Sequence, residues 1–149
     1  MTIWASLFNP NHRFRAIQGQ SAEWNRGAYL VEAAGHCGEC HTPRNLMQAL
    51  DQRHKFAGGV AEGWNAYNIS ADRVSGIGDW SAEQLAACLS TGHAKGRGVA
   101  SGPMAEAVEL SLSALTKSDI ASIVTYLRSV PAVRSDLPDM HGSAVSTGV

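Results

Sequence analysis

The sequence predicts an all-α domain with about three main helices joined by long loops. Helix caps and apolar stripes mark residues 21–34, 81–92 and 116–131 as these helices. No run alternates apolar and polar residues between hairpin turn residues, so we expect no β-strands. The segments 42–79 and 92–115 are rich in glycine and polar residues. Loops of this length are unusual in a small core, and they indicate a chain that wraps around a large, flat cofactor.

The first two helices carry signals at both of their ends. Ser21 is the expected N-cap of the first helix, and Gly35 is expected to end it. The second helix begins after Ser81, with Gln84 three residues later, which is the pattern of a capping box. Gly92 is expected to end this helix.

The third helix begins at Thr116, with Asp119 at the capping-box position, and Pro131 stops it. Its apolar residues recur at helical spacing and form one stripe. They are Ile120, Ile123, Val124 and Leu127. This stripe is the side of the helix that we expect to face the core.

Composition describes one ordinary globular domain. The chain has 149 residues, of which 44% are hydrophobic and 17% are charged, and its net charge is −1. A balance so close to neutral argues against a nucleic-acid partner. No apolar run approaches the roughly 20 residues of a membrane-spanning helix, so we expect no membrane span in this chain.

Cys37, Cys40 and His41 form a C-x-x-C-H motif, which is the attachment signature of c-type haem. Two cysteines three residues apart lie on one face of a helical turn. Both thiols can therefore reach the two vinyl groups at one edge of a porphyrin, and the histidine that follows can bind the iron. The motif predicts one haem c, attached through Cys37 and Cys40, with His41 as an iron ligand.

Zinc binding and thiol redox chemistry are the alternatives for this motif. A structural zinc site needs four ligands at suitable spacings, and the remaining cysteine, Cys88, has no partner at such a spacing. A thioredoxin-like motif needs a strand that leads into a helix, whereas the run before Cys37 reads as a helix. Haem attachment is the interpretation that the spacing favours.

Several runs resemble the class I cytochrome c domains of the multi-haem subunits that serve membrane-bound bacterial dehydrogenases for alcohols, gluconate and aldehydes. The runs are WNRGAYLVE (24–32), GHCGECHTPRN (35–45), WNAYNI (64–69), GIGDW (76–80) and GPMAEAV (102–108). The last run is most similar to the middle domain of the three-haem subunits. Tyr67 departs from the family, which usually has proline at this position, and this chain holds a single C-x-x-C-H motif.

The resemblance implies an electron carrier that is not itself an enzyme. It implies the class I cytochrome c fold, a dehydrogenase as electron donor, and another haem, a quinone or a terminal oxidase as acceptor. It also implies a periplasmic location, although no signal peptide is evident in this chain. We expect an N-terminal arm at 1–20, a cytochrome c domain at 21–131, and a linker or tail at 132–149, as in an internal piece of a longer exported protein.

The sixth position of the iron needs a second ligand, and the candidates are thioethers. Met104 follows His41 by enough residues to reach the opposite face of a haem, Pro103 stiffens its approach, and the resemblance implies the same residue. Met47 is too close to His41, and Met140 lies in the expected linker. His93 is the alternative ligand of another type, and an open sixth site would instead favour a haem sensor or a peroxidase-like enzyme.

Further residues are assigned by resemblance alone. The family implies Arg44, Trp64 and Asn68 as hydrogen-bond donors to the haem propionates. It also implies a close crossing of the terminal helices at Gly27, which would face Ile123 and Tyr126.

Overall fold

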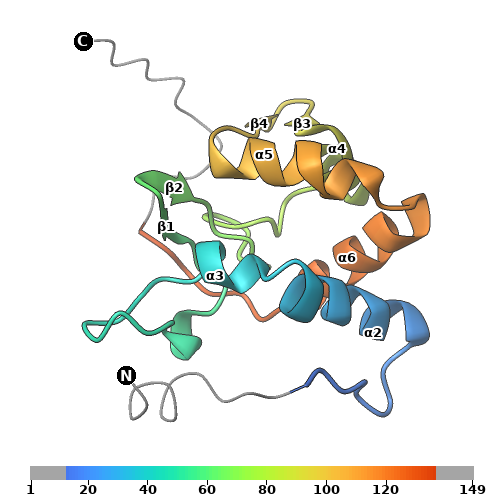
Figure 1. Ribbon diagram of the computed structural model, residues 1–149, viewed down its shortest axis with the longest axis horizontal. Coiled ribbons are helices and arrows are strands. Elements are labelled where there is room, and N and C mark those ends of the chain that lie inside the picture. The colour runs from blue at the N-terminus through green and yellow to red at the C-terminus, as the bar shows by residue number, and fades with distance from the viewer. Residues whose placement is uncertain (1–12, 137–149) are drawn as a thin grey trace.

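Five α-helices form the body of residues 13–136, the part of the chain that the computed structural model describes (Figure 1). They are α2 (Ala22–Tyr29), α3 (Cys37–His41), α4 (Ala82–Thr91), α5 (Pro103–Leu110) and α6 (Lys117–Ser129). A π-helical turn, η1 (Leu30–Ala34), continues α2, and the short 3-10 turns are η2 (Gln52–His54) and η3 (Leu112–Ala114). Within residues 13–136, no helix is both long and apolar enough to cross a membrane.

The first predicted helix is confirmed, and its last turn is wider than an α-helix. The Ser21 hydroxyl accepts a hydrogen bond from the Trp24 amide at 3.0 Å, as an N-cap does. At the other end, the Gly35 amide donates to the carbonyl of Leu30 at 2.7 Å. A Cβ on residue 35 would lie 2.8 Å from that carbonyl oxygen, so this position favours glycine. His36, with a left-handed φ of 49°, then turns the chain into α3.

Helices α2 and α6 come from distant parts of the sequence and pack closely together (Figure 1). They cross at Gly27, where an added Cβ would lie 1.9 Å from the Ser122 carbonyl oxygen and 2.8 Å from the Tyr126 Cβ. The expected close crossing at Gly27 is therefore present, with Tyr126 facing the glycine. The nearest atoms on α6 belong to Ser122 rather than to its neighbour Ile123.

The caps of α4 and α6 follow the sequence. Ser81 and Gln84 form both bonds of the capping box at the start of α4. At the start of α6, the Thr116 hydroxyl accepts from the Asp119 amide at 3.1 Å. The Asp119 carboxylate pairs with the Arg26 guanidinium of α2 at 2.7 Å, and this hydrogen bond is the main reason that its pKa is lowered.

The core lies where α4, α6 and η1 meet. The predicted stripe of α6 is buried, with Ile120, Ile123, Val124 and Leu127 each at most 5% exposed, and the last three of these belong to the core cluster. Trp80 and Leu85 flank the start of α4 and are both buried in the same cluster. These contacts fix the two long helices against the turn that leads into α3.

Two short β-hairpins occur where we expected none, so the prediction of a domain without strands is wrong. β1 (Gly59–Ala61) pairs antiparallel with β2 (Trp64–Ala66), and β3 (His93–Ala94) pairs antiparallel with β4 (Gly98–Val99). Strands of two or three residues are too short to show an alternating pattern in a sequence. The fold is mainly helical, with two small hairpins.

Helix α5 lies in the segment 92–115, which the sequence predicts to be a loop, so that prediction is wrong for α5. Pro103 occupies the first turn, where its missing amide hydrogen costs nothing. Gly102 stands at the N-cap without a side-chain hydrogen bond, so the usual starting signal is absent. As a consequence, Met104 lies in the first turn of a helix rather than in a loop.

Residues on both sides of the expected domain contact it. In the arm, the Ile17 amide donates to Asn25 Oδ1 at 2.7 Å. Beyond residue 131, the Val133 carbonyl accepts from Asn68 Nδ2 at 2.7 Å. The domain limits at 21 and 131 stay predictions, and residues 1–12 and 137–149 of the two end segments lie outside the described residues.

Replacing Gly27 with alanine should destabilise the domain strongly, by roughly 3 kcal/mol, because the new methyl group would meet the backbone of α6. The measurement is thermal or denaturant unfolding followed by circular dichroism. Gly38→Ala is the matched control, since its added Cβ would lie at an ordinary 3.6 Å from the nearest atoms. Equal stabilities of the two variants would contradict the close crossing.

Candidate cofactor site

Helix α3 carries two thiols one helical turn apart. Cys37 is half-buried and Cys40 is exposed, and no disulfide joins cysteines within residues 13–136. Burial raises the pKa of Cys37 to about 11, so its thiol is neutral near pH 7. Both thiols are thus available for attachment to a ligand at one face of α3.

The orientation of His41 is fixed by a backbone carbonyl. Its Nδ1 lies 2.7 Å from the carbonyl oxygen of Tyr67, 26 residues later in the chain. A carbonyl only accepts hydrogen bonds, so Nδ1 carries the hydrogen and Nε2 is the nitrogen that can bind a metal. Burial lowers the pKa of His41, which favours the neutral ring that metal binding requires.

The Tyr67 carbonyl is a functional group that sequence reasoning did not identify. Its position follows from the β1–β2 hairpin, in which Ala66 is the last paired residue, opposite Gly59. The hairpin lies against α3, because a Cβ on Gly59 would be 2.6 Å from the Cys40 carbonyl oxygen. The only sequence signal was the position itself, at which the family usually has proline.

Met104 lies half-buried in the first turn of α5. Gly102, two residues before Met104, has a left-handed φ of 53° and lies against the Trp64 ring. A Cβ on Gly102 would be 2.6 Å from two carbons of that ring. Trp64 of β2 therefore packs against the turn that starts α5, and Figure 1 shows β2 beside this end of α5, with α3 below both.

The other thioethers are placed differently. Met47 is 59% exposed in the loop that follows α3. Met140 lies outside the described residues. Of the three candidate thioethers, Met104 is the one that the described residues place in a helix, directly after Pro103.

Arg44 and Asn68, which the family implies as propionate donors, both make bonds within the protein. Arg44 donates to the Gln48 carbonyl at 2.9 Å and to the Glu39 carboxylate at 3.1 Å. Asn68 is 4% exposed, and its two amide hydrogens go to Ser75 Oγ and to a backbone carbonyl. Their role toward propionates stays a prediction, as does that of Trp64, whose ring is half-exposed.

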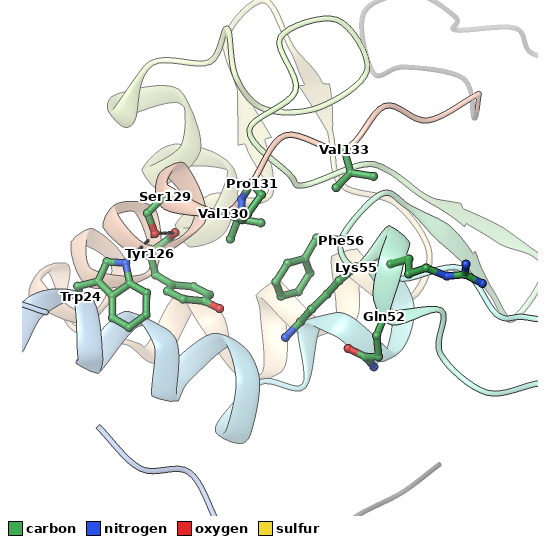
Figure 2. A pocket seen from close by; sticks show the side chains of 10 residues that line it. Trp24, Gln52, Lys55, Phe56, Tyr126, Ser129, Val130, Pro131 and Val133 are labelled. Carbon is green, nitrogen blue, oxygen red and sulfur yellow. Dashed lines mark hydrogen bonds between the residues drawn. The ribbon is translucent and has the colours of Figure 1, made fainter. Parts of the chain in front are cut away.

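A cavity of about 370 Å³ lies beside the crossing of α2 and α6. Figure 2 shows Trp24, Tyr126, Lys55 and Phe56 around it, and none of the predicted haem residues lines it. The buried Phe56 ring separates this cavity from α3, since a Cβ on Gly38 would lie 3.6 Å from its edge. The cavity is therefore on the far side of Phe56 from the cysteines.

The donor set of α3 fits a covalently bound haem c. It combines two thiols on one helical face with a histidine whose ring is already fixed by its second nitrogen. Among residues 13–136, no group of three or more His, Cys, Asp or Glu side chains could hold a metal ion. The zinc alternative thus finds no ligand set in the described part of the chain.

Comparison with known proteins gives relatives along most of the chain, although no model of a protein family matches it. The chain is 53% identical over 113 residues to the fructose dehydrogenase cytochrome subunit of Gluconobacter japonicus, covering 74% of this chain and 22% of the relative. It is 37% identical over 141 residues to the gluconate 2-dehydrogenase cytochrome c subunit of Pantoea cypripedii, covering 89% of this chain and 32% of the relative. It is 36% identical over 139 residues to the cytochrome c subunit of the alcohol dehydrogenase (quinone) of Gluconacetobacter polyoxogenes, covering 88% of this chain and 30% of the relative.

These relatives are much longer than the matched part, because the chain spans between 22% and 32% of their lengths. All three names are those of cytochrome subunits of dehydrogenases. They confirm the resemblance to the cytochrome c domains of dehydrogenase subunits that was drawn from the motifs.

Replacing Gly102 with alanine should displace Trp64 and the start of α5. We expect a loss of stability of roughly 2–3 kcal/mol from the steric conflict and the left-handed backbone together. Unfolding followed by tryptophan fluorescence measures it. Gly96→Ala is the matched control, because Gly96 also has a positive φ, of 78°, but nothing lies within 4 Å of an added Cβ. Equal losses would mean that the Trp64 contact contributes nothing.

Proposed function

We propose that this chain, a cytochrome c domain of the kind found in dehydrogenase cytochrome subunits, transfers single electrons through one haem c bound to Cys37 and Cys40. The observation that carries the proposal is the arrangement on α3, where two free thiols precede a histidine whose Nδ1 is bonded to a backbone carbonyl. When bound, the haem supplies the redox chemistry, a one-electron change between Fe(III) and Fe(II).

In this proposal His41 would be one of the two residues that bind the haem iron. The bond to the Tyr67 carbonyl supports the role, because it selects the tautomer with a free Nε2 and makes that nitrogen a stronger donor. The lowered pKa of His41 acts in the same direction, since it keeps the ring neutral at physiological pH. The ring therefore has both the protonation state and the support that a haem ligand needs.

Met104 would be the second residue that binds the haem iron in this proposal. It is supported by its place in the first turn of α5, directly after the rigid Pro103 and next to the contact of Gly102 with Trp64. A thioether favours Fe(II) and gives a higher reduction potential than a second histidine. A filled sixth position also leaves no site for oxygen or peroxide.

The partners follow from the names of the relatives. Fructose, gluconate and alcohol dehydrogenases have cytochrome subunits similar to this chain, so we propose a dehydrogenase as electron donor. Another haem, a quinone or a terminal oxidase would accept the electron, at the periplasmic face of the membrane. Trp64 and Arg44 are the proposed propionate donors at the haem edge. The family implies the same role for Asn68, but both of its amide hydrogens are bonded within the protein.

Absorption spectra of the chain, produced with a haem-maturation system, test the proposal. We expect a covalent, low-spin haem with the weak far-red band of Fe(III)–thioether ligation. A chain without covalent haem would contradict electron transfer by haem, and a high-spin haem that binds CO would favour the sensor or peroxidase-like alternative.

Met104→Ala should abolish the far-red band, make the haem high-spin and open it to CO, because it removes the sixth ligand. Met47→Ala is the matched control and should leave the spectrum unchanged. The same absorption measurement checks both variants. Retention of the band in Met104→Ala would contradict the assignment of Met104.

A further inference from the structure

The buried side chain of Asn68 is bonded to the C-terminal segment, residues 133–135, and Asn68 directly follows Tyr67, whose carbonyl supports His41. Its Nδ2 donates to the Val133 carbonyl at 2.7 Å and to Ser75 Oγ at 2.9 Å, and its Oδ1 accepts from the Ser70 amide at 2.8 Å. Every hydrogen-bonding atom of the amide is therefore used, in a place that is 4% exposed. A fully bonded, buried amide defines one backbone position rather than a range of them.

The C-terminal segment is fixed at the same place by a second residue. Ser70, which is fully buried, accepts from the Val133 amide at 3.1 Å and donates to the Val133 carbonyl at 3.2 Å. The Ser135 amide donates to Ser75 Oγ at 3.0 Å. Residues 133–135 thus lie along the 68–75 loop and are bonded to it through side chains.

The hydrogen bonds of Asn68 position the Tyr67–Asn68 peptide, whose carbonyl oxygen faces His41. The Tyr67 carbonyl belongs to the Tyr67–Asn68 peptide, and its oxygen lies 2.7 Å from His41 Nδ1. On its N-terminal side this peptide follows the last paired residue of β2, Ala66. On its C-terminal side, Asn68 is the first fixed point, and the Ile69 amide follows with a bond to the Phe56 carbonyl at 2.9 Å.

We infer that Asn68 is a positioning residue for His41, which holds the Tyr67 carbonyl in line with Nδ1 by bonding to Val133 of the C-terminal segment. The inference rests on the proposed function in so far as His41 is a haem ligand. It gives Asn68 a role through the histidine, separate from any contact with a propionate. It also means that residues 133–135 affect the histidine without touching it.

The test uses Asn68→Leu in the full chain with haem attached. Leucine has a similar shape and no charge, so it removes the hydrogen bonds without adding a charge that would itself change the reduction potential. We expect the His41 ring hydrogen of the Fe(II) protein to exchange at least about fivefold faster by NMR, as for the loss of one hydrogen bond. We also expect the reduction potential to rise, because a weaker bond to Tyr67 makes His41 a poorer donor to Fe(III).

Trp24→Phe is the control, because it removes a hydrogen bond of 2.6 Å, from Trp24 to Ser129, that lies away from His41. It should change neither the exchange rate nor the potential. Equal changes in the two variants, or no change in Asn68→Leu, would overturn the inference.

Two further measurements keep the inference testable. If Asn68→Leu does not fold, Ser70→Ala is the substitute variant, because it removes the two hydrogen bonds of the Ser70 hydroxyl to Val133 and leaves Asn68 in place. An unchanged exchange rate of the His41 ring hydrogen in Ser70→Ala would overturn the inference. If the unmodified chain takes up no haem, the proposed function has failed, and the Nδ1 chemical shift of His41 in the haem-free chain replaces the exchange rate. That shift must still differ between the unmodified chain and Asn68→Leu.

Discussion

The hydrogen bond between His41 and the Tyr67 carbonyl is the contact on which the arrangement of the site depends. One such bond contributes only about 1 kcal/mol, far less than the entropy lost in ordering the chain between two partners that are 26 positions apart. The surrounding structure must therefore impose it. The β1–β2 hairpin, a bond of 2.9 Å from the Gly58 amide to the His41 carbonyl, and the buried Phe56 do so. The ring orientation is thus a property of the folded chain before any cofactor is added.

The position of α3 in turn follows from the crossing of α2 and α6. Because Gly27 lets the two helix backbones touch, the end of α2 is fixed relative to the core. The π-helical turn η1 then adds one residue to the last turn, and Gly35 closes it against the Leu30 carbonyl. The left-handed His36 directs the chain into the first cysteine. A glycine at the crossing and a glycine at the exit therefore determine where the thiols lie.

The parts that local chemistry specifies could be predicted from the sequence, and the parts that long-range contacts specify could not. The caps at Ser21, Ser81 and Thr116 involve neighbours within three residues, so they are visible in the sequence. The hairpins consist of too few residues to show a pattern. Helix α5 lacks a capping side chain at Gly102, although its proline at the first position was a usable signal. The Tyr67 carbonyl could not be found at all, because every residue has a carbonyl and only folding selects one.

The Glu32 carboxylate, in the turn that leads into α3, is paired within the protein. The Glu32 carboxylate accepts from Lys55 Nζ at 2.6 and 2.7 Å and from the Tyr126 hydroxyl, so one side chain joins η1, the segment after η2, and α6. A half-buried carboxylate without its cation would be costly, and its negative charge already helps to raise the pKa of Cys37. Burial and the bond to Glu32 also raise the pKa of Tyr126, so the phenol keeps its hydrogen near neutral pH and donates it to Glu32. The ring of His41 is oriented by a different set of groups, namely the Tyr67 carbonyl, the hairpin that precedes it and the residues that hold it.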